Sequence, residues 1–282
     1  GDRSMTTKKH HIDTELGHLG LSPKENFGTP NPPIYRTSTI LSSSMAQHRG
    51  MLPKPYTYGR RGTPTSEAFE NAVASLYNAD TCISTCSGLS AISTAILSVV
   101  KSGEHALFPD SLYGSSRHFV KTLLKDFGIE VEFYPPRINR RITEHFKENT
   151  RLLYLESPGS LTFEVQDVPT MSTLARKHNI VTICDDTWGT ALHYPVLALG
   201  ADIVVEAATK YIAGHSDVNL GIAAANGTLG KKLRATAGAL GICAGPEDLY
   251  LGLRGLRTMR LRLEQSASNG LMLAQALAKH PL

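Results

Sequence analysis

The feature that most constrains the fold is a regular alternation of short apolar runs with segments of helical periodicity, which begins near residue 64. Short apolar runs bounded by turn residues are typical of buried strands, and apolar residues that recur every three to four positions indicate helices. Strands are predicted at Thr81–Thr85, His105–Phe108, Glu130–Tyr134, Arg151–Leu155, Ile180–Asp185, Asp202–Glu206 and Asn219–Ala224. Helices are predicted after Pro64 and at about 88–101, 114–127, 140–147, 168–178 and 247–270. The alternation indicates an α/β fold with a mostly parallel sheet flanked by helices.

The ends of the chain do not follow this pattern. Residues 5–62 are irregular and rich in Pro, Ser, Thr and Gly. A segment this long without periodicity is usually functional or wraps another part of a structure, so we interpret it as an N-terminal arm. We expect a large domain over 63–250 and the start of a second domain over 251–282, whose remainder would lie beyond Leu282. Residues 1–4, before Met5, are interpreted as a cloning scar.

Composition excludes several classes of partner. The net charge is +4 and the basic residues are scattered, whereas a nucleic-acid groove gathers Lys and Arg on one face. No apolar run is long enough to cross a bilayer, and the polar start carries no signal peptide. The four cysteines lack a zinc spacing and are expected to be reduced core thiols. We predict a cytoplasmic protein with no nucleic-acid, membrane or metal partner.

The first candidate site element is the small-residue turn Cys86–Ser90, between a predicted strand and a predicted helix. Ligands of parallel sheets bind at the carboxyl ends of the strands. A helix N-terminus there offers free N–H groups and a positive dipole end, which suits a phosphate group. Many strand-to-helix turns have this composition, so the turn alone is a weak indication.

Two further strand ends carry charged residues. Asp185 and Asp186 close a buried apolar strand, where two carboxylates need a cation, a metal or solvent; a turn or cap is the commoner use of Asp in this position. Lys210 follows the next strand and would be partly desolvated, which favours a Schiff base with a carbonyl cofactor. A phosphate cradle, a carboxylate and a lysine one βα unit apart together fit pyridoxal phosphate (PLP), whose ring nitrogen pairs with an Asp.

At these residues the chain resembles a known family. The run Ala208–Asp217 is similar to the cofactor-lysine motif of the cystathionine lyase and synthase group of fold type I PLP enzymes. Four shorter runs also resemble this group: Asp202-Ile-Val204, Ser111-Leu-Tyr-Gly114, Tyr58-Gly-Arg60 and Thr63-Pro-Thr65. Glu156-Ser-Pro-Gly-Ser160 and Asp186-Thr-Trp188 are similar to the bacterial branch that carries out β-elimination, with Asp186 where the family commonly has Asn. The match covers nearly the whole chain from about residue 12.

The resemblance implies a role for each matching residue. Lys210 would hold the cofactor as a Schiff base, Asp185 would pair with the pyridinium nitrogen, and Tyr113 would stack on the ring. Phosphate or neighbouring contacts are implied for Ser87, Gly88, Leu89, Thr187 and Thr209, whereas Ala207 replaces a Ser that the family often has. Tyr58 and Arg60 would reach the cofactor of a neighbouring subunit, which implies a homodimer or homotetramer with shared active sites. Tyr58, Tyr113 and Lys210 are the implied catalytic residues.

The implied activity is a carbon–sulfur lyase acting on a small amino acid, by β-elimination from L-cystathionine. Rivals within the family are a γ-lyase, a γ-synthase, a thiol-transfer enzyme and a non-catalytic relative that binds PLP. A nucleotide-binding domain without chemistry would show a G-x-G-x-x-G or P-loop motif, and neither occurs.

Overall fold

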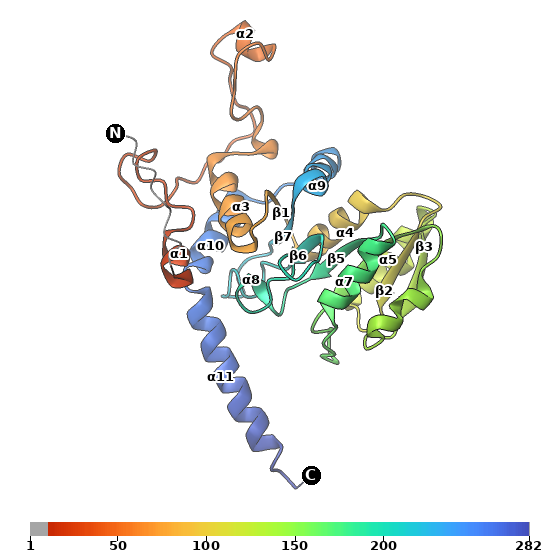
Figure 1. Cartoon of the computed structure of the whole chain (residues 1–282). Coiled ribbons are helices and arrows are strands. Elements are labelled where there is room, and N and C mark those ends of the chain that lie inside the picture. Colours follow the sequence, from red (N-terminus) through yellow and green to blue (C-terminus); the bar gives the residue numbers. More distant parts are fainter. Residues whose placement is uncertain (1–10, 282) are drawn as a thin grey trace, which may run out of the picture.

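A seven-stranded sheet forms the centre of the protein (Figure 1). The computed structural model describes residues 11–281, so the predicted cloning scar and the first residues of the predicted arm lie outside the described residues. The strand order is β1-β7-β6-β5-β4-β2-β3. The strands are β1 Thr81–Thr85, β2 His105–Pro109, β3 Glu130–Tyr134, β4 Thr150–Glu156, β5 Val181–Asp185, β6 Ile203–Glu206 and β7 Gly221–Ala225. All seven predicted strands are confirmed, with ends shifted by no more than two residues.

The pairing of the strands confirms a mostly parallel sheet. The ladders between β2 and β3, β2 and β4, β4 and β5, and β5 and β6 are all parallel. Strand β7 is the exception, because it runs antiparallel to both β1 and β6. The carboxyl ends of β4, β5 and β6 therefore meet at one edge, where Glu156 pairs with Asp185 in register.

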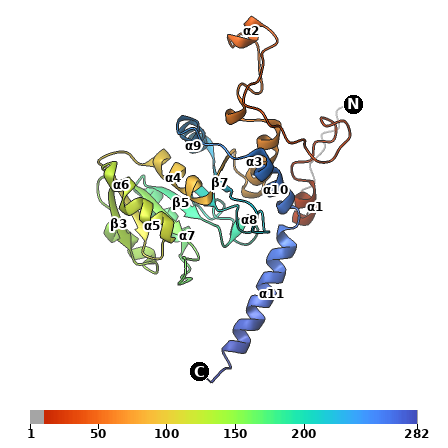
Figure 2. The same ribbon diagram turned by 180° about the vertical axis from the view of Figure 1, so that it is seen from behind.

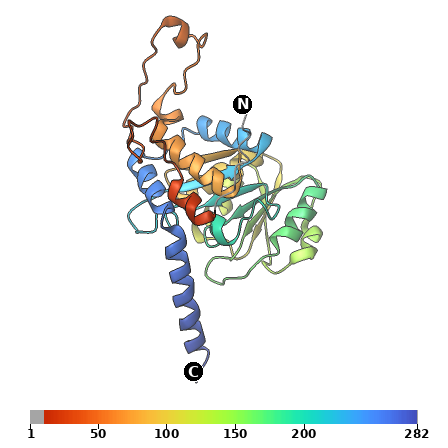
Figure 3. The same ribbon diagram turned by 60° about the vertical axis from the view of Figure 1, so that its left-hand side comes forward.

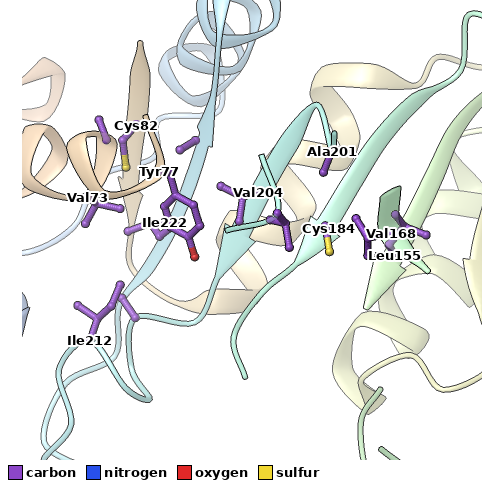
Figure 4. Packing of buried hydrophobic residues seen from close by; sticks show 14 of the residues in the cluster. Val73, Tyr77, Cys82, Leu155, Val168, Cys184, Ala201, Val204, Ile212 and Ile222 are labelled. Atoms are coloured by element: carbon purple, nitrogen blue, oxygen red, sulfur yellow. The ribbon is translucent and has the colours of Figure 1, made fainter. Parts of the chain in front are cut away.

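Helices cover both faces of the sheet and bury two apolar clusters against it. One face carries α4 Gly88–Val99, α5 Gly114–Lys121, α6 Leu123–Asp126 and α9 Gly227–Ala239 (Figure 2). The other face carries α3 Pro64–Tyr77, α7 Val168–Lys177, α8 Thr190–His193 and α10 Pro246–Leu256. Figure 4 shows part of this second cluster, in which Tyr77 of α3 lies beside Ile222 of β7. Because side chains alternate along a strand, consecutive residues of β5 and β6 face different clusters.

Three predicted helices need correction. The predicted helix at 114–127 is two helices, because α5 ends at Lys121 and α6 starts at Leu123 after Thr122, whose backbone is not helical. The predicted helix at 140–147 is a 3₁₀ helix, η2 Asn139–His145. The predicted helix at 247–270 is two helices, because α10 ends at Leu256 and α11 Met259–Leu277 starts in a new direction. Helix α9 was not predicted, since its buried side consists only of Gly230, Leu233 and Ala237 and shows little apolar periodicity.

Two segments extend away from the body of the protein (Figures 1 and 3). The N-terminal segment contains α1 Ile12–His18, α2 Met45–His48 and η1 Gly59–Arg61, and α2 stands at the tip of a long loop. Helix α11 buries only Met259 and Leu263. Within residues 11–281, no helix is long and apolar enough to cross a membrane. Cys82 and Cys184 are buried as predicted, but Cys86 and Cys243 are exposed because they lie in loops.

Candidate active site

A cavity of about 1790 Å³ lies at the carboxyl edge of the sheet. It brings together most of the residues that the sequence singled out, from four separate connections between strands and helices. They are Ser87, Gly88, Leu89, Tyr113, Asp185, Thr187, Thr209 and Lys210. Tyr58 and Arg60 are the two that do not line it. The topological reasoning is thus confirmed for this set, whereas the individual roles stay predictions.

The turn before α4 has the geometry of an anion cradle. Ser87 is the N-cap residue, and its hydroxyl accepts a hydrogen bond from the N–H of Ser90 at 3.1 Å. The N–H groups of Gly88 and Leu89 belong to the first helical turn, where no helix carbonyl can accept from them. A Cβ at Gly88 would lie 2.6 Å from the Cβ of Ala207. Gly88 and Ala207 are therefore both small because α4 and the lysine loop approach closely here.

Asp185 ends β5 and presents a buried carboxylate to the cavity. Its Oδ1 accepts from the hydroxyl of Thr187 at 2.6 Å and from the N–H of Thr187 at 3.1 Å. Its Oδ2 accepts from the hydroxyl of Tyr154 at 3.3 Å. Burial raises the pKa of Asp185, and no cationic side chain among residues 11–281 forms an ion pair with it. A cationic ligand group would supply the missing charge.

Lys210 lies in the turn after β6. Its backbone N–H donates to Ala207, and its carbonyl accepts from Gly214. Arg262 of α11 braces the same loop, with Nη1 donating to the carbonyl of Tyr211 at 2.7 Å. The side chain of Lys210 is exposed, so the expectation that the protein alone would desolvate it is wrong: the side chain projects into the open cavity instead of into the core.

The hydroxyl of Thr209 is already engaged with the backbone. It donates to the carbonyl of Leu220 at 3.0 Å and accepts from the N–H of the same residue at 2.9 Å. Its proton is not directed at a phosphate in this arrangement. Thr187 likewise supports Asp185 and accepts from the N–H of Ala207 at 2.9 Å. Their predicted contacts with the cofactor remain predictions.

Tyr113 is the N-cap residue of α5 and its side chain is 47% exposed, on the wall of the cavity. Its backbone N–H donates to Oε2 of Glu156 at 2.9 Å. Tyr58 and Arg60 line a second cavity of about 1070 Å³ that does not include Lys210. The guanidinium carbon of Arg60 lies 5.8 Å from the centroid of the Tyr58 ring. Within one chain, these two residues therefore do not join the other predicted site residues.

Sequence analysis missed a buried cluster on the opposite face of the sheet. The hydroxyl of Tyr77 lies 2.9 Å from Oδ2 of Asp186 and 2.8 Å from Oε2 of Glu206. Burial raises the pKa of Asp186 to about 9 and that of Glu206 to about 8. Asp186 therefore has the phenol of Tyr77 for a partner, which it shares with the carboxyl group of Glu206, and not the cation, metal or solvent that was expected. The signal for this cluster was weak, because its three residues are far apart in the sequence.

An aromatic wall at the mouth of the cavity was also missed. Phe163 and Trp188 pack edge to face with ring centroids 5.1 Å apart, and Tyr211 lies 6.3 Å from Trp188. Both Phe163 and Trp188 are about half exposed. Trp188 and Tyr211 each belong to a motif noted in the sequence, but Phe163 does not, and nothing local relates the three rings.

Known proteins share both the sequence and the architecture. A family model described as "Cys/Met metabolism PLP-dependent enzyme" matches residues 13–282. A protein named putative cystathionine beta-lyase from Rhizobium johnstonii is 42% identical over 98% of this chain and 69% of its own length. Cystathionine beta-lyase from Bordetella avium is 36% identical over 98% of this chain and 72% of its own length. A solved cystathionine gamma-lyase from Lactobacillus plantarum, in complex with L-serine, superposes with a TM-score of 0.90 at 29% identity, covering 96% of this chain and 70% of that one.

Proposed function

This chain belongs to the Cys/Met metabolism family of PLP-dependent enzymes, and from this premise we propose that it is a carbon–sulfur lyase acting on L-cystathionine by β-elimination. With uptake of one water molecule, the reaction yields homocysteine, pyruvate and ammonia. Support comes from the relatives named for cystathionine beta-lyase and from one structural observation, the convergence of Lys210, Asp185 and the start of α4 on one cavity.

The residues present fit PLP, the cofactor of the family. A buried carboxylate without a cationic partner suits a pyridinium nitrogen, and Asp185 provides it. The free N–H groups at the start of α4 suit the phosphate. The side chain of Lys210 opens into the same cavity and can attach the cofactor, while Tyr113 on the wall can cover the ring.

The reaction requires a base and an acid beside the substrate α-carbon. When bound, PLP supplies an electron-deficient ring that takes up the electron pair left by removal of the α-proton. We assign the removal of that proton to Nζ of Lys210, and the same group then donates a proton to the departing sulfur. Asp185 would hold a proton on the ring nitrogen of the bound cofactor. Thr187 and Tyr154 orient its carboxylate through the hydrogen bonds described above.

The N-terminal arm supports a shared active site. Tyr58 is 43% exposed, and Arg60 lies beside it in a cavity separate from that of Lys210. We propose that these two residues contact the cofactor of a second copy of this chain, so that the active enzyme is a homodimer or a larger homo-oligomer. A cytoplasmic location is proposed as well, because the four cysteines are free.

Replacement of Lys210 tests the assignment most directly. Lys210→Ala is expected to abolish pyruvate release from cystathionine and to remove the phosphopyridoxyl group that borohydride reduction leaves on the Lys210 peptide, as read by mass analysis. Lys231→Ala, in an exposed position on α9, is the matched control and should behave like the unchanged chain. Substantial elimination by Lys210→Ala would refute the role of this lysine.

The same variant tests the shared site. Lys210→Ala and Arg60→Ala are each expected to be inactive alone. A refolded mixture should regain activity, because a mixed dimer contains one site with both residues intact. An inactive mixture whose mixed dimers are demonstrated by mass would argue against sharing.

The second candidate is γ-elimination, which the similarity to a solved cystathionine gamma-lyase favours. The two reactions differ in the keto acid released, since β-elimination gives pyruvate and γ-elimination gives 2-oxobutyrate. Chromatographic analysis of the products from cystathionine separates them. Predominant 2-oxobutyrate would replace the first proposal by the second.

A further inference from the structure

Glu156 is a buried acidic residue at the carboxyl end of β4, next to Asp185 in the sheet. Its side chain lines the same cavity as Lys210, although the residue is only 4% exposed. Among residues 11–281 it forms no ion pair. A buried carboxyl group without a cationic partner is unfavourable unless hydrogen bonds compensate for the lost solvation.

The compensating bonds come from two segments that line the cavity. Oε2 accepts from the backbone N–H of Tyr113 at 2.9 Å, and Oε1 accepts from the backbone N–H of Ser160 at 2.8 Å. Tyr113 is the N-cap residue of α5, whereas Ser160 belongs to the loop after β4 that carries Phe163 of the aromatic wall. The two segments adjoin, since the N–H of Ser160 also donates to the carbonyl of Ser111 at 3.0 Å. One carboxylate thus connects the residue predicted to cover the cofactor with the loop at the cavity mouth.

The ionised form holds these two contacts better than the protonated form does. A carboxylate accepts strongly with either oxygen, but a protonated carboxyl group keeps one carbonyl acceptor and makes the other oxygen a hydroxyl, which accepts more weakly from its N–H donor. Burial, and after it the charge of Asp185, raises the pKa of Glu156 to about 7. As the pH falls through neutral, Glu156 is protonated and holds the Tyr113 and Ser160 segments less firmly. Glu156 also contributes to the raised pKa values of Tyr134 on β3, Tyr154 on β4 and Cys184 on β5. The charged side chains of Asp110, Arg117 and Lys210 line the same cavity.

We propose that Glu156 is a positioning residue for the reaction, whose carboxylate fixes the start of α5 at Tyr113 against the adjoining loop around Ser160, where both segments line the Lys210 cavity. The inference rests on the proposed function for its kinetic effect. The predicted effect of Glu156 on the bound cofactor is the same whichever substrate is cleaved, because Tyr113 and Asp185 both line the cofactor cavity.

Glu156→Gln is the decisive variant, since it keeps the size of the side chain but offers one acceptor and one donor. The expected kcat loss is on the order of 10- to 100-fold, the range for losing a charge-assisted hydrogen bond. In the unchanged enzyme we expect an acidic limb of the kcat profile with a midpoint near pH 7, the pKa of Glu156, and this limb should be absent from the variant. Borohydride labelling of Lys210 should remain complete. Glu148→Gln, an exposed glutamate before the opposite end of β4, is the matched control and should leave both readouts unchanged.

The visible absorbance of the bound cofactor separates this inference from the proposed function. Between pH 5 and 9, the unchanged protein should show a step near pH 7 that Glu156→Gln lacks, whatever substrate the enzyme accepts. Glu156→Asp keeps the charge and should keep the step with a lower kcat, which provides a test if the Gln variant fails to fold. A Glu156→Gln protein with unchanged kcat and an unchanged step would overturn the inference. Absence of C–S cleavage by the unchanged protein would overturn only the proposed function.

Discussion

Asp185 and Asp186 are neighbours in the chain, yet they lie on opposite faces of the sheet and have opposite surroundings. Asp185 faces the Lys210 cavity, and its carboxylate is held by the hydroxyl groups of Thr187 and Tyr154. Asp186 is fully buried on the other face, where it contacts Tyr77. The two-residue period of a strand produces this separation. Identical side chains at consecutive positions can therefore serve a ligand site and a structural cluster.

The number of protons available at the Tyr77 hydroxyl explains how Asp186 is accommodated without a cation. A phenol has one proton and can donate to only one carboxyl group, but the Tyr77 hydroxyl lies within 3 Å of both Asp186 and Glu206. The other carboxyl group must be protonated and donate to the phenolic oxygen, because two buried oxygens at this distance repel each other without a proton between them. The raised pKa values of Asp186 and Glu206 agree with a retained proton. The cluster thus replaces a cation by a shared proton.

The largest difference between the two aspartates is expected when each is replaced in turn by the neutral Asn. Asp185→Asn should lower kcat on the order of 100- to 1000-fold, the range for losing a preorganised electrostatic contact. Asp186→Asn should change kcat only about 2- to 3-fold, because its side chain does not line the cavity. A change of this size corresponds to less than about 0.7 kcal/mol in the activation free energy. Initial rates and cofactor content measured on both variants test this. Equal losses in the two variants would mean that the two faces are not independent.

A smaller effect, on stability, is expected from removing the Tyr77 hydroxyl that joins Asp186 and Glu206. Tyr77→Phe leaves two buried carboxyl groups without this partner and should lower the free energy of unfolding by about 1–3 kcal/mol. Urea unfolding followed by circular dichroism measures the change. Tyr250→Phe is the control, since the Tyr250 hydroxyl forms no hydrogen bond with any residue of the described chain. A Tyr77→Phe protein as stable as this control would show that the cluster contributes nothing to folding.

The smallest effect at any single step is the pH dependence of stability, measured one pH unit at a time. In the unfolded chain an aspartate loses its proton near pH 4, whereas Asp186 in the folded protein keeps its proton up to about pH 9. The folded state thus binds the extra proton, so the contribution of Asp186 to stability falls as pH rises between these values, by at most about 1.4 kcal/mol per pH unit. Asp186→Asn should flatten this fall, and its stability relative to the unchanged protein should increase between pH 6 and 9. Parallel stability curves from urea unfolding at pH 6, 7, 8 and 9 would contradict a retained proton.

Local patterns were sufficient to predict most of the fold. The seven strands are short apolar runs between turn residues, and each was placed to within two residues. Helix α9 was missed because only its Gly230, Leu233 and Ala237 are buried. The separation of α10 from α11 was missed as well, since the only nearby signal is Gly255, which lies within the last turn of α10 and not at the break at Arg257 and Thr258. That break follows from packing: α10 buries Leu249 and Leu253 in the core, whereas α11 leaves it.

The sequence by itself determined the α/β class and the grouping of Lys210, Asp185 and the turn at Gly88, because strand ends and small-residue turns are local patterns and a parallel sheet brings them to one edge. Only the tertiary structure decided that β7 is antiparallel, that Tyr77 pairs with Asp186 109 residues away, and that Tyr58 lies outside the Lys210 cavity. Such contacts depend on which distant segments pack together. Side-chain periodicity specifies which face of an element is buried, but it does not specify the residue on the other side of that contact.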